Sequence, residues 1–197
     1  SCSSFKHVSG KEMGNYISYG VREFGMFAIM NGMALHGGLL PYGGTFHMFS
    51  DYAKSALRMA ALMKIRTVAV LTHDSIGQGE DGPTHQPIEQ EAQIRLLEKL
   101  QNHSHKNSFL ALRPADVNEA TVAWKMALEN RDTPTGMILS RQGITNLPNS
   151  SYENALRAEK GGYIVEDAEG DLDIVLVANG SEVATLVAGA ALLRAEN

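Results

Sequence analysis

The feature that most constrains the fold of this chain is an alternation of two sequence patterns along most of its length. Short apolar, β-prone runs occupy residues 67–72, 108–112 and 135–140. Segments with the apolar spacing of helices lie between and around them, at residues 21–35, 52–63, 88–97, 116–128 and 182–197. Each β-prone run has the length of a buried parallel strand. The alternation therefore predicts an α/β fold with a parallel sheet flanked by helices.

A change of pattern divides the chain near its carboxyl-terminal end. Residues 166–171 form an acidic turn, after a stretch rich in glycine, asparagine, proline and serine, which is typical of a linker. A further β-prone run at 173–178 and the helical segment after it predict the first β–α unit of a second α/β domain, which one unit cannot complete. We expect a first domain over 1–145, a linker over 146–172 and a truncated second domain over 173–197 of a longer protein.

Charge and composition exclude several classes of protein. The formal net charge is -5 and the sequence pI is about 5.8, without a block of Lys or Arg, so nucleic acid is not an expected partner. The single cysteine, Cys2, cannot form an internal disulfide, and no apolar run has the length of a membrane span. We expect a cytoplasmic protein with no membrane partner.

The loop after the first predicted strand carries most of the functional information. Residues 73–87 read HDSIGQGEDGPTHQP and contain two histidines, three acids and three glycines. The loop follows the carboxyl end of a strand, which is where parallel α/β folds place ligand groups. This composition suits a preorganised site better than a plain connection.

Three other interpretations of this loop compete with a catalytic one. The run from Gly77 to Gly82 matches the dinucleotide pattern G-x-G-x-x-G, but prolines delay the following helix and two carboxylates would repel a phosphate. His73, Asp74, Asp81 and His85 could bind a metal, although they lack helical ligand spacing and a cysteine. A solvated surface loop is the third interpretation.

The same loop closely resembles the active-site loop of transketolases. Further matches follow in the same order along the chain, at residues 20–24, 31–38, 41–46, 49–52, 113–116 and 139–142. The resemblance covers essentially the whole chain. It implies a pyrimidine-binding domain and the beginning of a C-terminal domain, in a homodimer that holds thiamine diphosphate between its subunits.

The resemblance also implies a reaction and its cofactors. Transketolases transfer a two-carbon ketol unit from a ketose phosphate to an aldose phosphate in the pentose phosphate pathway. A divalent metal, Mg or Ca, would be bound by a domain absent from this chain, so we expect no metal ligand here. Dihydroxyacetone synthase and deoxyxylulose-phosphate synthase are related alternatives, and an isolated chain could also be a noncatalytic binding module.

Cofactor-binding roles follow from matching this sequence to the family. By spacing alone, Phe46, Phe49 and Tyr52 are ordinary core aromatics. An acid at Glu23 is only a favourable charge at the start of a helix. The resemblance implies instead that Glu23 meets the N1′ nitrogen of the aminopyrimidine and acts in catalysis, that Phe49 stacks on this ring and that the other two aromatic residues line its pocket.

Substrate-binding roles are implied in the same way. Asp81 would accept a hydrogen bond from a sugar hydroxyl, and His85 would transfer protons at the reacting oxygens. His73 would reach toward the sugar phosphate. Arg141, which is a surface arginine by sequence alone, would hold that phosphate through its guanidinium fork.

Overall fold

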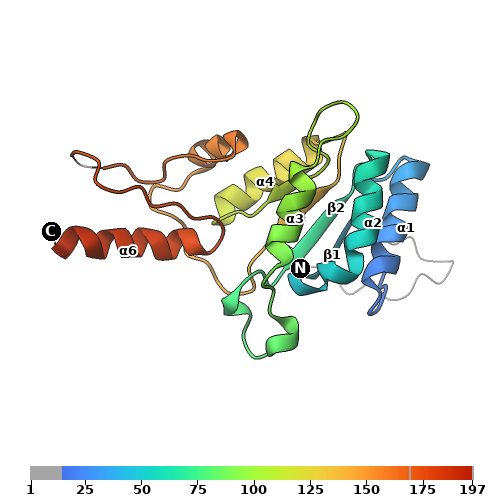
Figure 1. Ribbon diagram of the computed structural model, residues 1–197, viewed down its shortest axis with the longest axis horizontal. Coiled ribbons are helices and arrows are strands. Elements are labelled where there is room, and N and C mark those ends of the chain that lie inside the picture. The colour runs from blue at the N-terminus through green and yellow to red at the C-terminus, as the bar shows by residue number, and fades with distance from the viewer. Residues whose placement is uncertain (1–14, 169, 197) are drawn as a thin grey trace.

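A four-stranded parallel sheet forms the centre of the protein in the computed structural model, which describes residues 15–168 and 170–196 (Figure 1). Its strands are β1 Tyr42–Phe46, β2 Val68–Thr72, β3 Leu110–Leu112 and β4 Thr135–Ile138. They lie in the order β1-β2-β4-β3, and Val68 of β2 is opposite Tyr42 of β1 and Thr135 of β4. The predicted parallel α/β sheet is confirmed, with a strand inside each of the first three predicted runs.

Strand β1 was not predicted, because its Gly43–Gly44 pair resembles a turn. In the structure, Gly43 lies within a strand and leaves room for neighbouring side chains. A Cβ atom at Gly43 would lie 2.5 Å from the Met30 sulfur and 3.2 Å from the Met26 sulfur. Two methionines of the first helix therefore occupy the space that a side chain on the strand would need.

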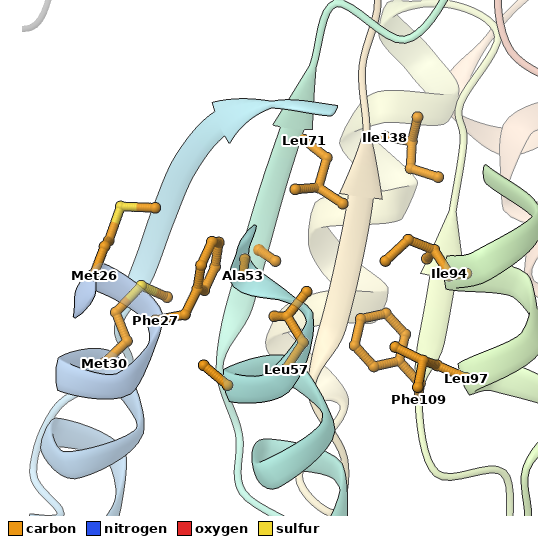
Figure 2. Close-up of a cluster of buried hydrophobic side chains, with 13 residues drawn as sticks. Met26, Phe27, Met30, Ala53, Leu57, Leu71, Ile94, Leu97, Phe109 and Ile138 are labelled. Carbon is orange, nitrogen blue, oxygen red and sulfur yellow. The ribbon is translucent and has the colours of Figure 1, made fainter. Parts of the chain in front are cut away.

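Helices cover both faces of the sheet. The long helices around it are α1 Glu23–His36, α2 Ser50–Met63, α3 Gln90–Lys99 and α4 Val117–Glu129. Helices α1, α2 and α3 pack their apolar side chains against one face, where Phe27, Leu57 and Leu71 are fully buried (Figure 2). Helix α4 packs against the other face, where Ala127 and Met137 are fully buried. Because both faces are covered, the central strand β2 is apolar from Val68 to Leu71.

The start of α4 shows how local sequence fixes a helix end. The Asp116 side chain accepts a hydrogen bond from the Glu119 amide at 2.9 Å, and the Glu119 carboxylate accepts one from the Ala115 amide at 2.8 Å. This pattern is a variant of the capping box in which Glu119 bonds the amide one residue before the cap, and it satisfies the Glu119 amide that the helix itself leaves unpaired.

The chain after β4 contains two short helices that were not predicted and lacks one predicted strand. Residues 146–172 include α5 Tyr152–Ala155 and a 3-10 helix, η4 Leu156–Lys160, whose Glu159 lies 2.5 Å from Lys125 of α4. The predicted strand at 173–178 is wrong for this structure, since none of these residues pairs in a ladder. A strand needs a neighbouring backbone to bond, and the described residues place none beside this run. The predicted helix forms as α6 Glu182–Glu196.

Candidate active site

The predicted aromatic residues and the 73–87 loop meet at the carboxyl edge of the sheet. Phe46 ends β1, Phe49 ends the 3-10 turn His47–Phe49, and Tyr52 lies in the first turn of α2. The loop leaves β2, the neighbouring strand, at His73. Parallel strands bring these two exits side by side, which is the position of ligand sites in such folds.

Five aromatic rings form one continuous cluster at this edge. Phe46 stacks on His73 with ring centroids 3.5 Å apart and planes inclined by 21°. Phe49 meets the edge of His85 at 5.0 Å. Phe49 also lies 6.3 Å from Phe46 and 6.1 Å from Tyr52. The structure thus joins the three aromatic residues predicted for the cofactor to two residues predicted for the substrate.

This cluster is open to solvent, in contrast to a core. Tyr52 is 62% exposed, and Phe46 and Phe49 are partly exposed. The interpretation of these side chains as ordinary core aromatics is therefore not supported. An aromatic surface that a small molecule can reach is suited to a flat heterocycle.

The two loop histidines are oriented by neighbouring hydroxyl groups. The Nδ1 atom of His73 lies 3.0 Å from the Thr72 hydroxyl, and Nδ1 of His85 lies 2.9 Å from the Thr84 hydroxyl. These hydrogen bonds fix the rings and leave Nε2 as the nitrogen available to a ligand. His73 also has a backbone φ of 62°, which is unusual for a residue other than glycine.

The electrostatic surroundings of His73 keep its ring neutral. Burial lowers the pKa of His73, and the positive charge of Arg141 and the nearby His85 lower it further, against the opposing effect of Asp81. All four predicted substrate residues therefore lie within electrostatic range of one another. A neutral imidazole at neutral pH can both donate and accept a hydrogen bond.

Arg141 and Asp81 remain available for a ligand. Both side chains are exposed, and neither makes a hydrogen bond or ion pair with the part of the chain that the structure describes. The Arg141 guanidinium lies against Gly79, where a Cβ atom would be 3.2 Å from its Cζ. Gly79 has a φ of 92°, so glycine supplies both the turn and the room for the arginine.

Glu23 is the predicted site residue that has neither a ring contact with this cluster nor an effect on the pKa of His73. It is the first residue of α1 and half-buried, and its carboxylate has no hydrogen bond or ion pair within residues 15–168 and 170–196. Figure 1 shows the start of α1 and the 73–87 loop at the same end of the sheet. A partly buried carboxylate without a partner is unusual and is available to a ligand.

The alternatives for the loop can now be compared with its geometry. Helix α3 begins only at Gln90, after the 3-10 turns Ile76–Gln78 and Pro83–His85, so no helix N-terminus follows the glycine pattern as dinucleotide binding requires. Among the described residues, no three His, Cys, Asp or Glu side chains are grouped to bind a metal ion. No described helix is both long enough and apolar enough to cross a membrane.

A buried ion pair behind the loop was not singled out from the sequence. Arg113 follows β3 and donates from Nε and Nη2 to Oδ2 of Asp74, at 2.9 and 2.8 Å. The side chains are 8% and 1% exposed. Burial acts to lower the pKa of Arg113, but Asp74 and Glu91 outweigh it and the pKa is raised. The sequence does contain a signal for this pair, because an acid and an arginine each follow a strand of the same parallel sheet.

Fold and site together define a parallel α/β domain with an open aromatic cluster at the strand ends. Residues 2–146 match the family model described as transketolase, pyrimidine binding domain. Transketolase 2 of Vibrio parahaemolyticus is 55% identical over 183 residues, which are 93% of this chain and 26% of that protein.

Comparison with solved structures also finds similarity to transketolases. A transketolase from Pichia stipitis in complex with sedoheptulose-7-phosphate has a TM-score of 0.79 and 45% identity, covering 92% of this chain and 25% of that one. The Campylobacter jejuni enzyme has a TM-score of 0.77 and 41% identity, with 92% and 26% covered. This chain belongs to the transketolase pyrimidine-binding domain family, as its sequence predicted. It spans about a quarter of the length of the curated relatives it matches.

Proposed function

We propose that this chain is the pyrimidine-binding part of a transketolase, a thiamine-diphosphate enzyme that transfers a two-carbon ketol unit between sugar phosphates. The observation that carries the proposal is the aromatic and histidine cluster beside Arg141 and Asp81 at the carboxyl edge of the sheet. The domain division stays as proposed, with residues 1–145, 146–172 and 173–197 as its three parts. The enzyme is proposed to be a cytoplasmic homodimer that holds its cofactor between subunits.

The residues present fit the aminopyrimidine half of the cofactor. Phe49 offers a partly exposed ring for stacking, with Phe46 and Tyr52 beside it. Glu23 offers a carboxylate with no partner in the described part of the chain, suited to a ring nitrogen that shares a proton. Thiamine diphosphate, when bound, supplies the carbon nucleophile and the electron sink. Its diphosphate and the divalent metal, magnesium or calcium, are proposed to be held outside this chain.

The remaining polar residues are suited to a sugar phosphate. His85 takes up and returns a proton at the reacting oxygen, because Thr84 fixes the ring and Nε2 has no hydrogen-bond partner within the described residues. Asp81 accepts a hydrogen bond from a sugar hydroxyl. His73 donates from Nε2 to the phosphate, and Arg141 contributes a charge-assisted hydrogen bond to the same group.

The proposal is tested in the full-length enzyme that carries this chain, with Glu23→Gln as the variant. The wild type should transfer a two-carbon unit from a ketose phosphate to an aldose phosphate. Exchange of the C2 proton of bound thiamine diphosphate, followed by proton NMR, should slow in the variant on the order of 10²–10⁴-fold, as expected when a positioned acid–base group is lost.

The matched control is Glu153→Gln, which changes an exposed glutamate in the first turn of α5. It should leave proton exchange and ketol transfer unchanged. Exchange at the wild-type rate in Glu23→Gln would remove Glu23 from the proposed mechanism. A wild-type protein that binds thiamine diphosphate without ketol transfer would reject the proposed reaction.

A further inference from the structure

Arg113 is the centre of a polar network that joins three parts of the molecule behind the candidate active site. We call residues 73–87 the substrate loop. The Arg113 guanidinium contacts Asp74 of this loop at 2.8 Å, Glu91 of α3 at 3.4 Å and Glu182 of α6 at 2.6 Å. Nη1 also donates to Oδ1 of Asn179 at 2.6 Å. Its side chain is only 8% exposed, so these partners replace the water that the cation loses.

Asp74, the residue that pairs with Arg113, directly follows His73, which has a strained backbone conformation. His73 occupies the left-handed backbone region at a φ of 62°, which costs free energy for any residue with a Cβ. Such a conformation persists only where the surroundings impose it. Stacking on Phe46 holds the ring, and the buried pair with Arg113 fixes the backbone at Asp74, the next residue in the chain.

We propose that Arg113 is a positioning residue for the substrate loop. Through the two nitrogens, Nε and Nη2, that donate to Oδ2 of Asp74, it keeps His73 in the left-handed conformation that presents the ring to the sugar phosphate. Arg113 itself does not touch the substrate. The proposal rests on the function proposed above, because it assumes that His73 binds the phosphate.

The carboxyl-terminal segment takes part in the same arrangement. The Gly180 amide donates to the Arg113 carbonyl at 3.2 Å, and a Cβ atom at Gly180 would lie 2.6 Å from Nε of Arg113. Gly180 also has a φ of 58°. The chain therefore closes over the arginine at a position that requires glycine. The Ser75 and Ser181 hydroxyls lie 3.5 Å apart, which adds a second link between this segment and the loop.

Conservative variants are needed to test the proposal, because deleting either partner would leave a buried charge unpaired. Arg113→Lys keeps the charge but cannot place two nitrogens on Oδ2 of Asp74 while also contacting Glu91 and Glu182. Asp74→Asn keeps the shape and removes the negative charge. The matched control is Lys125→Gln, which breaks the exposed ion pairs of α4 with Glu129 and Glu159, away from the site.

The measured quantity is phosphate selectivity in the full-length holoenzyme. It is the ratio of kcat/KM for a ketose phosphate donor to kcat/KM for hydroxypyruvate, measured with an acceptor that carries no phosphate. We expect this ratio to fall about three- to thirtyfold in Arg113→Lys and Asp74→Asn, mainly through KM of the ketose phosphate. Lys125→Gln should leave it unchanged. A loss of folded protein alone would lower both kcat/KM values equally.

Double variants that also carry His73→Ala distinguish a failure of this proposal from a failure of the proposed function on which it rests. His73→Ala should itself lower the ratio, and adding Arg113→Lys or Asp74→Asn should lower it no further, because both act through His73. If Arg113→Lys or Asp74→Asn lowers the ratio as much in the His73→Ala background as in the wild type, the pair acts independently of His73 and the proposal is overturned. An unchanged ratio in both Arg113→Lys and Asp74→Asn would overturn it as well.

The remaining outcomes are also decisive. If Arg113→Lys does not fold, as judged by circular dichroism, Asp74→Asn decides alone. Glu182→Gln, which changes a half-exposed partner of the same guanidinium, should give a smaller fall of about two- to threefold. If His73→Ala leaves the ratio unchanged while ketol transfer continues, the phosphate assignment of the proposed function is the statement that fails.

Discussion

Two apolar, β-prone runs of this protein differ in structure: one forms a strand and the other does not. Residues 68–72 read VAVLT and form β2, which pairs with a strand on each side. Residues 172–178 read LDIVLVA and form no strand. Leu71 in the first run is 0% exposed, whereas Val177 in the second is 85% exposed. We call these the central run and the carboxyl-terminal run.

The comparison shows that an apolar β-prone sequence is not sufficient for a strand. The central run has a strand on each edge and helices on both faces, so its amides are paired and its side chains are buried. The carboxyl-terminal run has α6 along it but no paired strand among the described residues, and α6 extends away from the sheet (Figure 1). Pairing and burial come from the surrounding structure.

The largest expected effect is the difference between truncations in the two runs. Leu71→Ala should lower the free energy of unfolding by about 2–5 kcal/mol, because it leaves a cavity in the core. Leu172→Ala, at a residue that is 66% exposed, should change it by less than about 0.5 kcal/mol. Urea unfolding of this chain, followed by circular dichroism, measures both. Equal losses would show that the carboxyl-terminal run is packed in solution.

A smaller effect is expected from a polar group inside the well-packed region. His47 is 0% exposed, and neither ring nitrogen has a hydrogen-bond partner within the described residues. His47→Leu should raise the free energy of unfolding by about 1–3 kcal/mol, because it removes an unsatisfied buried group. His103→Leu, at an exposed histidine, is the matched control and should have little effect. A loss of stability in His47→Leu would mean that water or a ligand satisfies the imidazole.

The smallest expected effect is a pH dependence from the same histidine. Burial lowers the pKa of His47, and Arg113 acts in the same direction against Glu91, Asp74 and Asp51. The unfolded chain therefore binds a proton more readily than the folded one. Protonation of His47 therefore does not affect the free energy of unfolding above the unfolded pKa of about 6.5, and it lowers that free energy as the pH falls below this value.

Thermal unfolding between pH 7.5 and 5.5 measures this contribution. The wild type should lose about 1 kcal/mol more than His47→Leu over this interval. Some dependence should remain in the variant, because the pKa of His73 is also lowered. Identical pH profiles for the two proteins would show that His47 does not remain neutral in the folded state.

The sequence predicted the sheet because its central strands are buried on both faces and read as continuous apolar runs. It predicted a helix over 116–128, whose start is set within one turn by Asp116 and Glu119. It missed β1, whose Gly43 is explained only by the methionines of α1. It also missed the Arg113–Asp74 pair, because residues 39 positions apart are joined by strand order rather than by local pattern.

The strand order β1-β2-β4-β3 also has a consequence for how the site comes into existence. Val68 needs Tyr42 on one edge and Thr135 on the other, so the strand that carries the substrate loop has both neighbours only after β4 has been synthesised. Contacts between residues so distant in sequence require the closure of long loops and make folding slow. During synthesis, the substrate loop leaves the ribosome before β4 does, and β2 then lacks one of its two neighbouring strands. We expect the nascent chain to need chaperones during this interval, because its unpaired strand edge and apolar side chains are exposed.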